Sequence, residues 1–110
     1  MRLQQVNYHL TTADGFELTY SKVPNSSGRT FKQLGTDTWN GEAELHTETV
    51  QIEFVWAGGR REDFELTGDQ HRDLESWGLE NEWLARVSDG EVPEDALEEV
   101  LQDIPRQKVA

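Results

Sequence analysis

The chain contains no cysteine and only three prolines, and its ten basic residues face 22 acidic ones. Without cysteine there is no disulfide, no thiolate metal ligand and no thiol nucleophile. No apolar run approaches the roughly 20 residues of a membrane-spanning helix. The first residues also lack the apolar stretch of a signal peptide. We therefore expect a cytoplasmic protein that has no contact with a membrane.

The negative charge is unevenly distributed along the 110 residues, whose net charge is −12. Residues 1–40 carry a net charge of +1, residues 41–66 carry −5 and residues 67–110 carry −8. Such an excess repels nucleic acid and anionic membranes and attracts basic surfaces. A protein adapted to high salt would also be acidic and poor in lysine. That adaptation should extend over the first forty residues as well, and these are almost neutral.

Length and aromatic content indicate one folded domain. A chain of 110 residues corresponds to a single domain with one core. Four Trp, four Phe and two Tyr supply apolar area that disordered chains lack. We expect one domain over residues 1–105, followed by a frayed tail at residues 106–110.

Alternating apolar residues predict strands in the first two-thirds of the chain. Val6, Tyr8 and Leu10 alternate with polar residues, which places them on one face of a strand near residues 3–11. An Asp-Gly turn then leads into a second strand near residues 16–22. These two segments predict a hairpin.

The clearest alternation lies in the middle of the chain. It places four large side chains on one face: Val50, Ile52, Phe54 and Trp56. The Gly-Gly pair at 58–59 turns the chain into another strand that contains Phe64 and Leu66. Residues 31–37 fit either a helical turn or an irregular strand, and this choice stays open.

Helical spacing replaces alternation after residue 66. Thr67 and Gln70 fit a capping box at the start of a first helix. A second short helix follows from Leu79, and Pro93 suits the first turn of a third. The third helix has an apolar stripe made of Leu97, Val100, Leu101 and Ile104.

Strands followed by helices are typical of an α+β domain. We expect an antiparallel sheet of four to five strands, with two to three short helices packed on one face. Trp56, Trp77 and Trp83 share stripes with other apolar residues and should lie in the core. Trp39 has no such partners and is the best candidate for an exposed aromatic contact.

No catalytic motif is present. The chain lacks a nucleophile elbow, a phosphate-binding loop and a His-Glu-x-x-His sequence. The histidines His9, His46 and His71 do not have metal-ligand spacing, and we expect them to face solvent. We therefore expect neither catalysis nor a cofactor nor a metal. A small enzyme or metal protein that uses these three histidines is the third hypothesis.

The last helix carries more acidic side chains than the stability of a helix explains. Glu94 and Asp95 lie in the first turn, where the helix dipole stabilises them by roughly 0.3–1 kcal/mol each. Glu98, Glu99 and Asp103 lie beyond that turn, and like-charge i,i+4 pairs cost about 0.2–0.5 kcal/mol each. The next basic residues in sequence are Arg86 and Arg106, so no base within the helix relieves these pairs.

Two explanations of this charge remain. It either keeps the surface solvated or forms a binding face for a cationic partner. The candidate partner-binding residues are Glu94, Asp95, Glu98, Glu99, Asp103 and Trp39.

The expected function is that of a non-catalytic acidic inhibitor that occupies the basic groove of a nucleic-acid-binding protein. Inhibitors of restriction and CRISPR systems from phages are comparable in charge and size alone. Carboxylates four apart on a helix rise about 6 Å, and those two apart on a strand about 6.6 Å, near the roughly 6.8 Å of alternate DNA phosphates. A row of Glu42 and Glu44, or of Asp63 and Glu65, beside Glu94 and Glu98 could therefore imitate a track of phosphates. The alternative is an acidic immunity protein or secretion chaperone that binds its partner through an apolar or aromatic surface.

Overall fold

The computed structural model describes residues 2–15, 17–34 and 47–104. Its elements, in chain order, are β1 (Leu3–Thr12), β2 (Glu17–Pro24), β3 (Phe31–Leu34), β4 (Thr47–Trp56), β5 (Arg61–Thr67), α2 (Gly68–Ser76), α3 (Glu80–Ser88) and α4 (Pro93–Gln102). Trp39, His46 and the tail at 106–110 lie outside the described residues.

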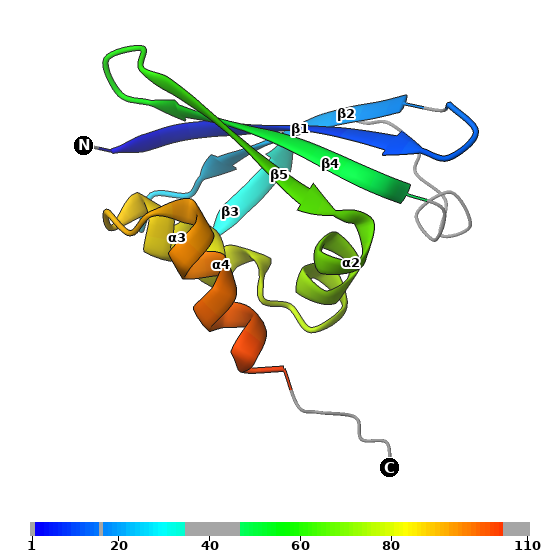
Figure 1. Cartoon of the computed structure of the whole chain (residues 1–110). Helices are drawn as coiled ribbons and strands as arrows, with labels where there is room; N and C mark the ends of the chain where they lie inside the picture. Colours follow the sequence, from blue (N-terminus) through cyan, green and yellow to red (C-terminus); the bar gives the residue numbers. More distant parts are fainter. Residues whose placement is uncertain (1, 16, 35–46, 105–110) are drawn as a thin grey trace.

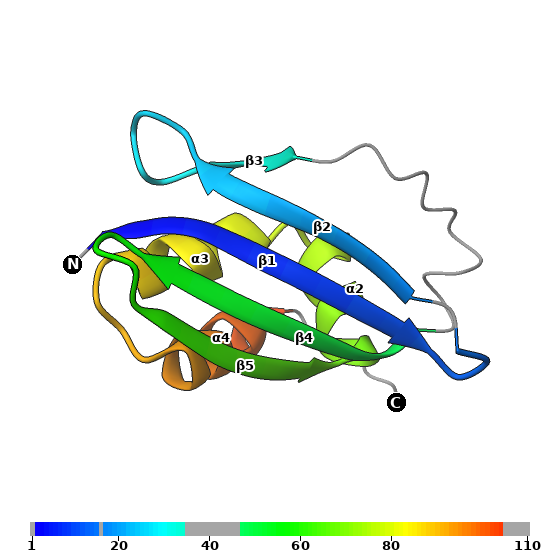
Figure 2. The same ribbon diagram turned by 90° about the horizontal axis from the view of Figure 1, so that it is seen from above.

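The five strands form one antiparallel sheet in the order β3-β2-β1-β4-β5. The three helices lie together on one face of this sheet (Figure 1). Seen from above, none of the described helices lies on the other face, and β5 forms one edge beside α4 (Figure 2). The expected α+β fold, with its sheet in the N-terminal two-thirds and its helices after it, is confirmed. Residues 31–34 form a strand.

Alternation along β1 and β4 divides the side chains between the two faces. Val6, Tyr8 and Leu10 are buried on the face that the helices cover. Val6 is paired with Phe54 of β4, and Tyr8 is paired with Ile52 of β4. The residues between them in β1 point to the uncovered face. The period-two pattern therefore sets both the core and the polar face of the sheet.

The helices close the core over these strands. Trp83 of α3 is fully buried, and its ring meets Phe54 edge-on at 5.8 Å between centroids. Its Nε1 donates a hydrogen bond to the Pro93 carbonyl at 2.9 Å, which ties α3 to the start of α4. Trp83 and Trp56 are buried as the sequence predicts.

The helix starts also follow the sequence. The Thr67 hydroxyl accepts from the Gln70 amide at 3.1 Å, and the Gln70 side chain accepts from the Thr67 amide at 2.9 Å. This is the predicted capping box. Pro93 occupies the first turn of α4, where its missing N–H needs no partner.

Two predictions about side-chain environment are wrong. Trp77 is 44% exposed because α2 ends one residue before it, and Gly78, at φ +69°, redirects the chain. His71 is only 1% exposed, although we expected it to face solvent. It lies three residues from both Gly68 and Leu74, on the buried stripe of α2.

Gly68 gives a first stability prediction. A Cβ at this position would lie 1.8 Å from the Thr47 carbonyl oxygen, and no side-chain rotation can relieve that contact. Gly68→Ala should therefore lower the free energy of unfolding by about 3 kcal/mol or more. Gly58→Ala, where a Cβ meets nothing within 4 Å but φ is +97°, should cost about 1 kcal/mol. Urea unfolding compares the two variants, and equal losses would contradict the prediction.

Within the described residues, no helix has the length and apolar character needed to cross a membrane.

Candidate functional site

The five candidate carboxylates of α4 all lie on its solvent side: Glu94, Asp95, Glu98, Glu99 and Asp103. The opposite side of the helix is buried through Ala96, Leu97 and Val100. This burial leaves the acids as two rows along the two flanks of the helix. The rows have different surroundings.

The row of Asp95, Glu99 and Asp103 meets α3 through Glu99. Arg86 of α3 donates a hydrogen bond to Glu99 at 2.9 Å and lies 3.8 Å from Glu91. Sequence spacing within α4 shows no base near Glu99, but the packing of α3 supplies one. The expectation of an unrelieved carboxylate is therefore wrong for Glu99. This row therefore offers a cationic partner less unpaired negative charge than the other row does.

The other row, Glu94 and Glu98, faces β5 and α2. Together these elements enclose a groove of about 640 Å³, which we call the acidic groove. Its floor is apolar and its rim is polar. The floor residues are Phe64, Leu97 and Leu101, and the rim residues are Glu65, Glu94, Glu98, Gln70 and Gln102.

Among the described residues that line the acidic groove, none is basic. None of its three carboxylates forms an ion pair within the part of the chain that the structure describes, although Glu65 accepts a hydrogen bond from Gln51. Such a groove suits a long cationic side chain, because the aliphatic stem covers apolar surface while the charged end reaches a carboxylate. Of the residues proposed from sequence, the structure brings Glu94 and Glu98 together here.

The row suggested from sequence, Glu65 beside Glu94 and Glu98, meets in this groove, whereas Glu42 and Glu44 lie outside the described residues. Sequence reasoning missed Gln70 as part of the site. The capping role predicted for Gln70 does not indicate which helix lies opposite it. Glu65 alternates with Phe64 in the edge strand β5. Because neighbouring residues point to opposite faces, the groove reaches both faces of the sheet at β5.

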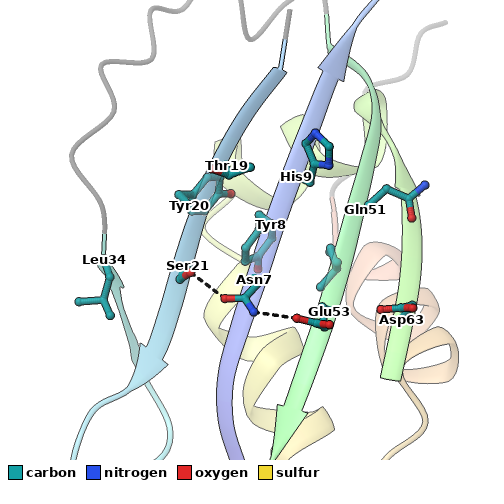
Figure 3. A pocket seen from close by; sticks show the side chains of 11 residues that line it. Asn7, Tyr8, His9, Thr19, Tyr20, Ser21, Leu34, Gln51, Glu53 and Asp63 are labelled. Carbon is teal, nitrogen blue, oxygen red and sulfur yellow. Dashed lines mark hydrogen bonds between the residues drawn. The ribbon is translucent and has the colours of Figure 1, made fainter. Parts of the chain in front are cut away.

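The uncovered face of the sheet holds a second hollow, of about 550 Å³, whose lining is mostly polar but includes Leu34 and Ile52 (Figure 3). At its centre the Ser21 hydroxyl donates to Asn7 Oδ1 at 2.7 Å, and Asn7 Nδ2 donates to Glu53 at 2.9 Å. Arg61 donates to the same Glu53 oxygen at 3.1 Å. The Asn7 hydrogen bond and the nearby Arg61 charge lower the pKa of Glu53. The polar groups at the centre of this hollow are therefore hydrogen-bonded to one another.

His9 lies on this uncovered face and pairs with Glu17. Its neighbour Tyr8 points to the helix side, where its ring lies 6.2 Å from that of His71. The sheet therefore separates His9 from His71, and these two histidines cannot share a metal ion. Within residues 2–15, 17–34 and 47–104, no cluster of three potential ligands is suited to a metal.

A buried polar cluster lies beneath β1 and β2. The rings of Tyr8 and Tyr20 stack at 4.5 Å, and the Tyr20 hydroxyl lies 2.9 Å from His71 Nε2. His71 Nε2 also lies 3.2 Å from a Glu75 oxygen. A hydrogen on Nε2 places a donor against that carboxylate, and Nδ1 then has no partner among the described residues.

His71 gives a prediction that involves no binding partner. Burial lowers the pKa of His71 to about 4, with Glu80 opposing the shift and Lys22 and Arg72 adding to it. Because this value lies below the roughly 6.5 of an unfolded histidine, the folded chain favours the neutral ring. Stability should then fall between pH 6.5 and 4, by about 3 kcal/mol in total.

NMR titration of the His71 ring measures this directly. We expect a midpoint near pH 4, and His71→Gln should remove the corresponding part of the pH dependence of unfolding. A midpoint at or above about pH 6.5 would show that burial does not control this ring.

Comparisons with protein-family models, with curated proteins and with solved structures find no match. Function therefore rests on the geometry of the chain itself.

Proposed function

We propose that this chain is a non-catalytic acidic protein that occupies the basic, nucleic-acid-binding surface of a partner protein and excludes the nucleic acid. The acidic groove carries the proposal: three carboxylates border an apolar floor, and none of the described lining residues is basic. Lysine and arginine side chains of a partner fit both features. The net charge of −12 would also accelerate the encounter with a basic partner.

The spacing of carboxylates on α4 supports imitation of a nucleic acid. Glu94 and Glu98 are one turn apart, a rise of about 6 Å along the helix. Alternate phosphates of one DNA strand rise about 6.8 Å. The proposed class is that of anti-restriction or anti-CRISPR inhibitors, acting in the cytoplasm, where such partners bind nucleic acid.

Affinity capture tests this proposal. The chain, immobilised at low salt, should retain basic nucleic-acid-binding proteins from a native lysate and release them as salt is raised. A matched column carrying Glu94→Lys with Glu98→Lys should retain much less of the same proteins. Equal retention on both columns, or retained proteins that resist high salt, would contradict the proposal.

One observation favours the alternative of an immunity protein or secretion-type chaperone. Trp77 exposes 44% of its surface, and exposed aromatic residues often anchor protein interfaces. A complex of that kind should depend weakly on salt and should be lost in Trp77→Ala. Retention of full binding by Trp77→Ala would remove this alternative at that residue.

A further inference from the structure

Strand β5 is the edge of the sheet next to the acidic groove (Figure 2). Its hairpin with β4 begins where the Trp56 amide donates to the Arg60 carbonyl at 2.8 Å. Hydrogen-bonded and non-bonded pairs alternate along an antiparallel ladder. Counting from the bonded pair Trp56 and Arg60, the pair Ile52 and Phe64 is also hydrogen-bonded, so the backbone N–H and C=O of Phe64 point toward β4. Those of Asp63 and Glu65 point outward.

This outward edge is open over the middle of the strand. At its end the Thr67 amide is already used, because it donates to the Gln70 side chain at 2.9 Å. In the part of the chain that the structure describes, no group hydrogen-bonds to the outward amides and carbonyls of Asp63 and Glu65. An edge of this kind can accept a further strand from another molecule.

The side chains on each face decide which strand fits. Residues opposite Asp63 and Glu65 would place their side chains on the uncovered face, beside those two carboxylates. The residue between them would point to the helix side, over the floor formed by Phe64 and Leu97. The matching sequence is therefore cationic, apolar, cationic. Glu94 and Glu98 border the same floor and add attraction for basic flanking residues.

A second copy of this chain does not meet these requirements. Antiparallel pairing of β5 with another β5 around Phe64 would set Asp63 opposite Glu65 and gather four carboxylates on one face. Like charges directly opposite each other destabilise a strand pair. The acidic edge thus resists self-association and favours a basic strand.

We propose that β5 accepts an extended partner segment with alternating basic and apolar residues as a sixth strand of the sheet. This inference rests on the proposed function and identifies the form in which the basic partner binds. Backbone hydrogen bonds to Asp63 and Glu65 align the partner segment with β5. The carboxylates on both sides of the edge select lysine and arginine.

N-methylated peptides test the inference against simple charge attraction. The probe is an acetylated, amidated Lys-Val-Lys-Val-Lys peptide, studied by NMR at low salt with the full chain. In the proposed register the lysine N–H groups face β5 and the valine N–H groups face solvent. Methylation of the lysine nitrogens should weaken binding about tenfold or more, since it removes the backbone bonds. Methylation of the valine nitrogens is the matched control and should leave binding within about twofold.

The unmodified peptide should also slow hydrogen exchange of the Asp63 and Glu65 amides. Equal binding of the two methylated peptides, without that protection, would overturn strand addition but leave an acidic binding surface in place. Failure of all three peptides to bind near Glu94, Glu98 and Glu65 would overturn both the inference and the role of the groove. An acidic Glu-Val-Glu-Val-Glu peptide should not bind.

Discussion

Lys22→Met should lower the free energy of unfolding by about 3–5 kcal/mol, the largest effect of any single substitution proposed for this chain. Lys22 of β2 forms an ion pair with Glu80 of α3, and their side chains are only 14% and 8% exposed. Removal of the ammonium would leave the Glu80 carboxylate buried without its counter-ion. One Glu80 oxygen already lacks a hydrogen-bond partner among the described residues.

The double variant Lys22→Met with Glu80→Leu separates this cost from the loss of packing. It should recover most of the stability, because apolar residues of similar volume often replace a buried ion pair without loss. Burial, and then the nearby Glu80 charge, raise the pKa of Tyr8, so this hydroxyl stays protonated in all variants. Urea unfolding of the three variants at pH 7 supplies the comparison. A double variant no more stable than Lys22→Met would show that the ion pair is not the cause.

The double reversal Glu94→Lys with Glu98→Lys should weaken binding of a captured basic partner tenfold or more, about 1.4 kcal/mol or above. Two carboxylates of the acidic groove would be replaced by lysines. Their ammonium groups would repel a basic partner, and their aliphatic stems would cover the apolar floor. The free energy of unfolding should fall only by about 1 kcal/mol, because both side chains are exposed and the main loss is the favourable interaction of Glu94 with the dipole of α4. The repulsion between them, about 0.2–0.5 kcal/mol, is present before and after the change.

The matched control reverses the same number of charges elsewhere. Glu48 and Glu82 are exposed and do not line the groove. Glu48→Lys with Glu82→Lys changes the net charge equally and should weaken binding much less, mainly through a slower association rate. Calorimetric titrations of both variants with the same partner compare them. Equal losses would show that net charge, rather than the groove, determines the affinity.

The sequence predicts most of the fold because its signals are local. Alternation at Val6, Tyr8 and Leu10 sets the buried face of β1, and the pairing of Thr67 with Gln70 marks the start of α2. Both depend on neighbours within a few residues. The sequence leaves the order of the strands open, because alternation indicates which face of a strand is buried but not which strand pairs with it.

The candidate site was less predictable because it depends on packing between distant segments. Glu99 appeared unrelieved until α3 placed Arg86 beside it, 13 residues away in sequence. His71 appeared to be a surface residue, since a histidine on a buried stripe looks like any other polar residue in a helix. The acidic groove joins Glu65 to Glu94 and Glu98, and no spacing rule connects a strand to a helix three elements later.

Competition with nucleic acid is the most direct test of the central claim. The captured partner, saturated with this chain, is titrated with its own nucleic acid, and the bound fraction of each ligand is measured by sedimentation. We expect mutually exclusive binding: each nucleic acid molecule that binds displaces one chain, and Glu94→Lys with Glu98→Lys makes displacement easier. A stable ternary complex of chain, partner and nucleic acid would contradict the account.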